Sequence, residues 1–177
     1  MLFRSNPVFG LNTLGGALSI TTKNGFSYPG HSAELEGGSF GRIISSVESG
    51  GHRNNWGYFA TASYFEEDGW RDRSESDAIN LFGTISHHTE STMLDLSLGH
   101  GDTELVGNGP LPVQLLAQDR SDIFTSPDIT ENNMYLVNAQ VSHWYSDQVQ
   151  FAGNVLDRKS TRLNSSHMSE SRMPSSA

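Results

Sequence analysis

The sequence predicts an all-β fold. From His31 onward, apolar and polar residues alternate with a period of two, and no stretch carries the apolar stripe of period 3.6 that a buried helix face needs. Glycine is abundant, with 18 residues among 177, and Gly-Gly and Asn-Gly pairs fall where the alternation breaks off. No apolar run approaches the roughly 18 residues of a membrane-spanning helix, so a transmembrane helix is excluded.

The stretch 6–23, NPVFGLNTLGGALSITTK, stands before the alternating segments. Gly15 and Gly16 break any helix, and residues 17–22 then alternate as a short strand that an Asn-Gly turn at 24–25 closes. A phosphate-binding loop is the rival interpretation of the glycines. It would need a Lys-Ser/Thr pair to reach the phosphates and a magnesium ion, and the stretch lacks that pair.

Seven further strands are expected. Each sets small or aliphatic residues on one face against polar residues on the other, as Leu94, Leu96 and Leu98 stand against Asp95 and Ser97. The polar face is expected to be hydrophilic along its whole length. The expected strands are 31–36, 42–49, 56–65, 79–86, 94–99, 135–142 and one that begins at Val149.

Aromatic residues fall near the strand ends, at Trp56, Tyr64, Tyr135 and Trp144. A soluble β-sandwich also alternates, so alternation alone fits both a soluble and a membrane protein. Strands of roughly 10 residues with aromatic ends are what a transmembrane barrel needs. Lipid satisfies no backbone hydrogen bond, so strands cross a membrane only as a closed barrel.

The connections supply independent support for a barrel. They alternate between short and long along the chain, as the tight periplasmic turns and extended outer loops of outer-membrane barrels do. A soluble sandwich has no physical reason to separate them in this way. The short ones are expected at 50–55, 87–91 and 145–148, and the long, acidic ones at 66–77 and 101–133.

The segment 157–177 has no period and few apolar residues, which predicts a disordered tail. Its string DRKSTRLNSSH resembles the translation of a common sequencing adapter, and ESRMPSSA resembles the distal end of that adapter. We therefore expect 157–177 to be non-native, with natural protein ending near Leu156. At the other end, MLFRSNPVF lacks the features of a signal peptide. Either the protein is not exported, or Met1 is an internal methionine of a longer gene.

Charge and cysteine content exclude two classes of protein. Without the basic and acidic residues of 157–177, the formal net charge goes from −9 to about −11. The remaining Lys and Arg are scattered, and phosphate contacts need them clustered, so no nucleic-acid partner is expected. The absence of cysteine excludes a disulfide scaffold and thiolate metal sites.

The stretch NPVFGLNTLGGALSITTK resembles the end of the plug domain of TonB-dependent outer-membrane receptors. GGSFGR, DGWRDRS and GNGPLP are similar to barrel sequences of the same family. The resemblance runs from Asn6 to about Leu156. It implies that 1–26 is the end of a plug and that 27–156 forms the first strands of a large antiparallel transmembrane β-barrel.

Members of this family are barrels of 22 strands around an N-terminal plug, in the outer membrane of Gram-negative bacteria. The resemblance therefore implies energy-coupled uptake of a scarce nutrient, such as an iron–siderophore complex or cobalamin. Its partners would be that ligand, outer-membrane lipid, and TonB through a box that this sequence lacks. With about seven strands and most of the plug missing, the sequence is expected to be a gene fragment of such a transporter.

His100, Asp102 and Glu104 lie two apart, so a continuing strand would place them on one face, a spacing that could hold a metal ion. They also lie on the same face as the leucines before them. This indicates a solvated rim at the point where a lipid-facing strand leaves the membrane and enters the outer loop. No metal ligand is assigned. His87 and His88, near Glu90, are expected to be solvated in a short turn.

Trp70, Arg71 and Arg73 lie in the second outer loop and could meet an anionic ligand through cation and aromatic contacts. The other interpretation pairs the two arginines with acidic residues of the same loop, namely Asp68, Asp72 and Glu75. The candidate ligand-binding residues are thus Trp70, Arg71, Arg73, His100 and Asp102.

No nucleophile elbow, metalloprotease helix or paired carboxylates stand out, so we expect no enzyme activity, no catalytic residue and no cofactor. Two alternatives to a receptor remain. A general porin or other outer-membrane barrel, such as an adhesion barrel, would lack a plug, and a soluble all-β carbohydrate-binding module would not enter a membrane.

Overall fold

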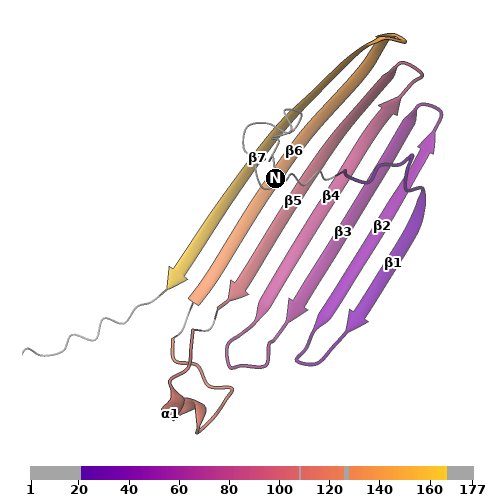
Figure 1. Ribbon diagram of the computed structural model, residues 1–177. Coiled ribbons are helices and arrows are strands. Elements are labelled where there is room, and N and C mark those ends of the chain that lie inside the picture. The colour runs from indigo at the N-terminus through magenta and orange to yellow at the C-terminus, as the bar shows by residue number, and fades with distance from the viewer. Residues whose placement is uncertain (1–20, 108, 126–127, 167–177) are drawn as a thin grey trace, which may run out of the picture.

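The computed structural model describes residues 21–107, 109–125 and 128–166. Seven antiparallel strands form one open sheet, and their order in space follows their order in the sequence (Figure 1). The all-β fold with seven antiparallel strands is therefore confirmed. The strands are β1 (Gly30–Gly37), β2 (Ile43–Arg53), β3 (Trp56–Glu67), β4 (Ser76–His88), β5 (Thr92–Val106), β6 (Asp128–Ser146) and β7 (Val149–Ser166).

A short helix, α1 (Val113–Leu116), lies in the connection between β5 and β6. Within the described ranges, no helix is long and apolar enough to cross a membrane.

The connections are short at one end of the sheet and long at the other, which confirms the predicted alternation (Figure 1). We call these the short-turn end and the long-loop end. The short-turn end holds 54–55, 89–91 and 147–148, and the long-loop end holds 38–42, 68–75 and 107–127.

The strand register places the apolar residues of neighbouring strands side by side. Leu98 of β5 pairs with Gly83 of β4 and with Val137 of β6, and directly paired residues point to the same side of a sheet. We call this side the apolar face. Its exposed large side chains include Leu35, Ile43, Val47, Trp56, Tyr58, Tyr64, Ile79, Leu81, Ile85, Leu94, Leu96, Leu98, Tyr135, Val137, Phe151 and Val155.

The opposite side, which we call the polar face, carries Glu48, Thr84 and Ser97 among others. It is not hydrophilic along its whole length, because Phe59 and Phe82 have the same parity. Phe59 is only 4% exposed. The prediction of a uniformly hydrophilic face is wrong at these positions, because a local alternation pattern does not show which residues another segment covers.

Residues 21–29 cross the polar face near the short-turn end before the chain enters β1 (Figure 1). The Lys23 ammonium lies 2.9 Å from the Glu48 carboxylate of β2 and 5.6 Å from the centre of the Phe59 ring. The amides of Phe26 and Ser27 each donate to the Asn24 side-chain oxygen at 3.0 Å. The turn predicted at 24–25 is thus confirmed.

Of the short strand predicted over 17–22, residues 17–20 lie outside the described part of the chain, and Thr21 and Thr22 are not in a strand. The later strands are longer than predicted. β5 reaches Val106 and β6 begins at Asp128, so part of the expected 101–133 loop is paired strand. Backbone pairing continues there although Asp102, Thr103 and Glu104 are polar on both faces, and apolar alternation gives no signal for such residues.

Strand β7 continues to Ser166, and its residues 157–166 pair with β6. The disordered tail predicted from Asp157 is therefore a strand over that range, while 167–177 lies outside the described residues. Without β7, the edge of β6 would present unpaired backbone groups along its length, and a neighbouring segment of any polar composition can pair with such an edge. The adapter origin of the segment stays a prediction.

Candidate functional site

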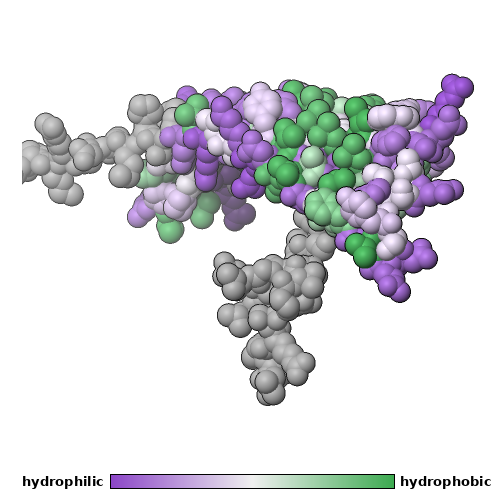
Figure 2. Space-filling model, turned by 90° about the horizontal axis from the view of Figure 1, so that it is seen from above, coloured by the Kyte–Doolittle hydropathy of each residue, from purple (hydrophilic) through white to green (hydrophobic). Residues whose placement is uncertain are grey.

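The apolar face is a continuous exposed surface of hydrophobic side chains that runs across the strands. Leu98 is 51% exposed and Val137 is 44% exposed, although both lie in the middle of their strands. A hollow of about 640 Å³ opens over the centre of this face, with Ala60, Ala62 and Gly83 among its lining residues. Seen from the short-turn end, hydrophobic residues gather in the middle of the view with hydrophilic residues on either side (Figure 2).

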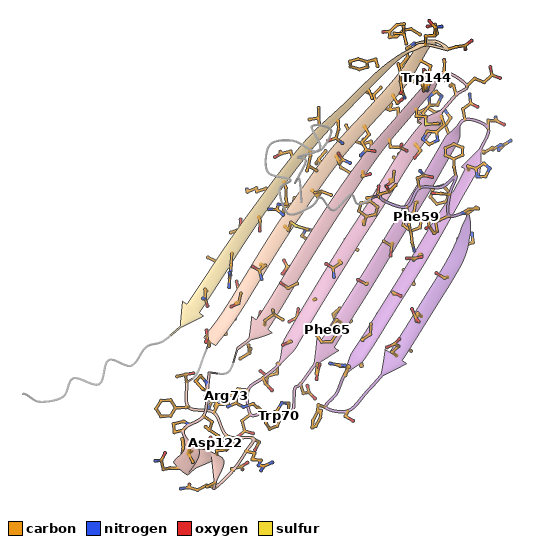
Figure 3. All side chains as sticks on the ribbon, in the orientation of Figure 1. Phe59, Phe65, Trp70, Arg73, Asp122 and Trp144 are labelled. Atoms are coloured by element: carbon orange, nitrogen blue, oxygen red, sulfur yellow. The ribbon has the colours of Figure 1, made fainter. Side chains whose placement is uncertain are left out.

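Aromatic residues mark both ends of the apolar face. At the short-turn end, Trp56 and His87 pair across β3 and β4 with their ring centres 4.6 Å apart. Toward the long-loop end, Tyr135 stacks on His100 at 4.6 Å. Trp144 also lies at the short-turn end (Figure 3). Its position in the alternation of β6 places it on the polar face, next to a shift in the pairing register of β6 and β7 between Trp144 and Ser146.

His100 and Asp102 lie on the same face of β5, as predicted. His100 Nδ1 is 3.2 Å from the carbonyl oxygen of Met134, and the Asp102 carboxylate accepts a hydrogen bond of 2.7 Å from the side-chain amide of Asn133. In the part of the chain that the structure describes, no group of three His, Asp or Glu side chains is placed to hold a metal ion. Both residues are thus satisfied by β6.

Acidic side chains gather beyond the apolar face at the long-loop end. A hollow of about 370 Å³ there is lined by Asp77, Asp102, Glu104 and Glu131. These residues continue the parity of the apolar face, so the face ends in a carboxylate rim.

The loop residues Trp70 and Arg73 lie together at the long-loop end, near Asp122 (Figure 3). Trp70 is 57% exposed, and the Arg71 guanidinium lies 5.9 Å from the centre of its ring. Arg73 has a left-handed backbone with φ of 51°. The structure therefore keeps Trp70 available for contact at the surface.

Arg71 does not have the carboxylate partners that the sequence suggested. Its Nη1 donates to the carbonyl of Gly109 at 3.3 Å, and its Nη2 donates to the carbonyl of Asp122 at 3.0 Å. Its Nε is buried without a hydrogen-bond partner among the described residues. The side chain joins the two long loops, because each of its carbonyl partners lies in 107–127.

A second contact joins the same loops, since the Asp72 amide donates to the carbonyl of Ser121 at 2.9 Å. Ser121 is itself held by Asp119, whose carboxylate accepts from the Ser121 hydroxyl at 2.7 Å and from its amide at 2.8 Å. These two hydrogen bonds lower the pKa of Asp119, and the bond from the hydroxyl has the larger effect. Among the candidate ligand-binding residues, Arg71 thus has a structural role, because its guanidinium holds the two long loops together.

Sequence reasoning missed the cluster at the short-turn end of the polar face. Phe26 stacks on both His52 and His88, and His88 Nε2 lies 3.1 Å from the Asp95 carboxylate. The prediction that His88 is solvated in a turn is wrong, since its side chain is 19% exposed. The parity of His88 and Asp95 was visible in the sequence, whereas the contact with Phe26 was not.

Comparison with protein-family models, with curated proteins and with solved structures finds no match to this chain.

Proposed function

We propose that the sheet is part of a transmembrane β-barrel in the outer membrane of a Gram-negative bacterium. In this proposal the apolar face meets lipid and the polar face meets the lumen. The observation that carries the proposal is an apolar face that stays exposed across the strands while polar residues line the other side. In water such a surface would favour association or aggregation, since monomeric soluble proteins rarely expose more than a few hundred Å² of continuous apolar surface.

The height of the apolar face agrees with a membrane. From Trp56 to Tyr64 on β3, eight residue steps of about 3.3 Å span roughly 26 Å along the strand. A strand tilt of about 40° reduces this to roughly 20 Å along the membrane normal, comparable with the apolar band of about 25 Å in outer-membrane barrels. The aromatic residues at the two ends of the face would then lie at the two interfaces.

We further propose that the barrel is that of a TonB-dependent receptor, which takes up a scarce nutrient such as an iron–siderophore complex or cobalamin. Residues 21–29 support this, because they cross the polar face, and in a barrel that face lines the lumen where a plug lies. The anchored pair of long loops would stand at the outer surface, with Trp70 as a ligand contact. TonB, the ligand and lipid are the partners, and no enzyme activity is proposed.

The lipid contact can be tested by spin labelling, because the chain has no native cysteine. Single cysteines are placed at each of 136–141 on β6, and the refolded chain is inserted into vesicles. We expect labels at Val137, Ala139 and Val141 to collide with oxygen and not with a water-soluble nickel complex. Labels at the three alternate positions should show the reverse.

A soluble module would give a different result, with Val137, Ala139 and Val141 shielded from both reagents, and that would overturn the membrane proposal. A porin would pass the labelling test, so the receptor needs its own. We expect DNA upstream of the Met1 codon in a longer clone to encode a plug, a TonB box and a signal peptide. An unrelated upstream sequence would contradict the receptor proposal, and the proposal of a membrane barrel would still stand.

A further inference from the structure

Three strands form a slot on the polar face at the short-turn end. His52 of β2 and His88 of β4 are its walls, and Gly57 of β3 is its floor. The Phe26 ring fills it, with its centre 5.1 Å from that of His52 at an interplanar angle of 27° and 4.5 Å from that of His88 at 13°. A Cβ at position 57 would lie 2.8 Å from Phe26 Cε2, so only glycine lets the ring sit this close to the sheet.

Each imidazole is oriented by a hydrogen-bond partner. His52 Nδ1 lies 3.3 Å from the carbonyl oxygen of Gly25, which belongs to the docked segment itself. His88 Nε2 lies 3.1 and 3.2 Å from the two carboxylate oxygens of Asp95 on β5. The Ser86 hydroxyl donates to the same carboxylate. The slot therefore holds two titratable rings in fixed orientations against one aromatic ring.

The charged groups around the slot come from three elements. Asp95 of β5 faces His88, while Glu48 lies further along β2 on the same face as His52. Lys23, from the segment before β1, pairs with Glu48 at 2.9 Å. Strand β3 contributes uncharged Gly57. Asp95 thus offsets a charge on His88, and the Lys23–Glu48 pair is neutral as a unit.

We propose that this slot is a pH-responsive latch, which holds residues 24–28 against the polar face more firmly as the pH falls. Histidine gains its proton between about pH 5 and pH 8. Two interactions with the rings exist only while the segment is docked, namely the stacking of Phe26 and the Gly25 carbonyl contact. Both strengthen on protonation, because a cation is attracted to an aromatic face and a charged donor makes the stronger hydrogen bond.

Two effects oppose the latch. Docking removes water from the imidazolium ions, and the two rings repel each other when both are charged. The Asp95 carboxylate compensates the first effect at His88, and Phe26 keeps the rings apart on its opposite faces. The latch depends only on these contacts and holds whether or not the sheet spans a membrane.

The test uses the full chain in detergent micelles with a nitroxide on Ser27→Cys. Ser27 is exposed, and its amide keeps the bond to Asn24. Between about pH 8 and pH 5.5 we expect the ratio of immobilised to mobile label to rise roughly threefold to tenfold. An unchanged or falling ratio would overturn the proposal, and so would a label that is mobile at both pH values.

Two controls test whether these histidines produce the response. In the double variant His52→Gln and His88→Gln, we expect the ratio to lose its pH dependence, because glutamine keeps a hydrogen-bonding side chain that does not titrate. A response equal to that of the unchanged chain would overturn the assignment to these histidines. A second label at Glu36→Cys, exposed near the other end of β1, reports on the sheet, and its mobility should not change. A parallel change there would mean that the whole sheet responds, which contradicts a local latch.

Discussion

The Phe26 ring stacks almost parallel to the His88 imidazole, with ring centres 4.5 Å apart and an interplanar angle of 13°. This contact joins the segment before β1 to the last residue of β4, on the same face as the buried Phe59. The polar face is therefore packed where the incoming chain crosses it. The apolar face carries no such cover among the described residues.

We expect Gly57→Ala to release the segment from the sheet. The new methyl group would lie 2.8 Å from Phe26 Cε2, and the two histidine rings leave Phe26 no room to move sideways. Trypsin should then cut after Lys23 roughly tenfold faster than in the unchanged chain, since cleavage follows the open population. Gly83→Ala is the matched control, because its nearest neighbour would be the Phe59 oxygen at 3.5 Å. Equal cleavage rates in the two variants would contradict this close packing.

We expect Val137→Arg to destabilise the protein in lipid vesicles far more than Gln140→Arg does. Both residues are exposed and lie on β6, but Val137 is on the apolar face and Gln140 on the polar face. An arginine in the lipid-facing middle of a barrel costs about 2–4 kcal/mol. At an exposed site in water the change stays within about 0.5 kcal/mol. Urea titration of vesicle-bound protein measures the difference, and equal midpoints would count against a lipid contact.

The sequence predicted the faces of the strands well and their ends poorly. Leu94, Leu96 and Leu98 share a face because side chains alternate along any strand, whatever the partner. The end of β5 at Val106 was not predictable, since Asp102 to Glu104 are polar on both sides and only backbone pairing defines the strand there. The same limit applies to β7 beyond Asp157.

The site predictions failed where a contact joins distant parts of the chain. Arg71 bonds to carbonyls 38 and 51 residues away, so the nearby acids that the sequence offered as partners were the wrong ones. The Phe26 slot combines residues from three strands and the preceding segment. No local period or spacing brings such residues together.

We expect Ser121→Ala to raise the pKa of Asp119 back toward its ordinary value of 3.8. The Ser121 hydroxyl is the largest cause of the lowered pKa, and the amide bond remains in the variant. A group whose pKa is lowered on folding stabilises the folded loop above its unfolded pKa and loses that contribution as the pH falls through its folded pKa. Carboxyl NMR shifts between about pH 2 and pH 6 follow this titration. An unchanged midpoint would show that the hydroxyl bond is absent in solution.

Arg71→Lys should separate the two long loops although the charge is kept. The guanidinium spans two carbonyls, at 3.3 Å to Gly109 and 3.0 Å to Asp122, whereas an ammonium is a compact point charge that lacks this fork. The Asp72 amide, which donates to Ser121 across the loops, should then exchange with deuterium roughly tenfold faster.

Trp70→Phe is the matched control for Arg71→Lys, because it changes the neighbouring side chain and leaves both carbonyl bonds in place. We expect the Asp72 amide to stay protected in that variant, since the Arg71 guanidinium lies 5.9 Å from the centre of the indole ring and its two carbonyl bonds do not involve the indole. If Arg71→Lys leaves the exchange unchanged, the loops are joined by other contacts.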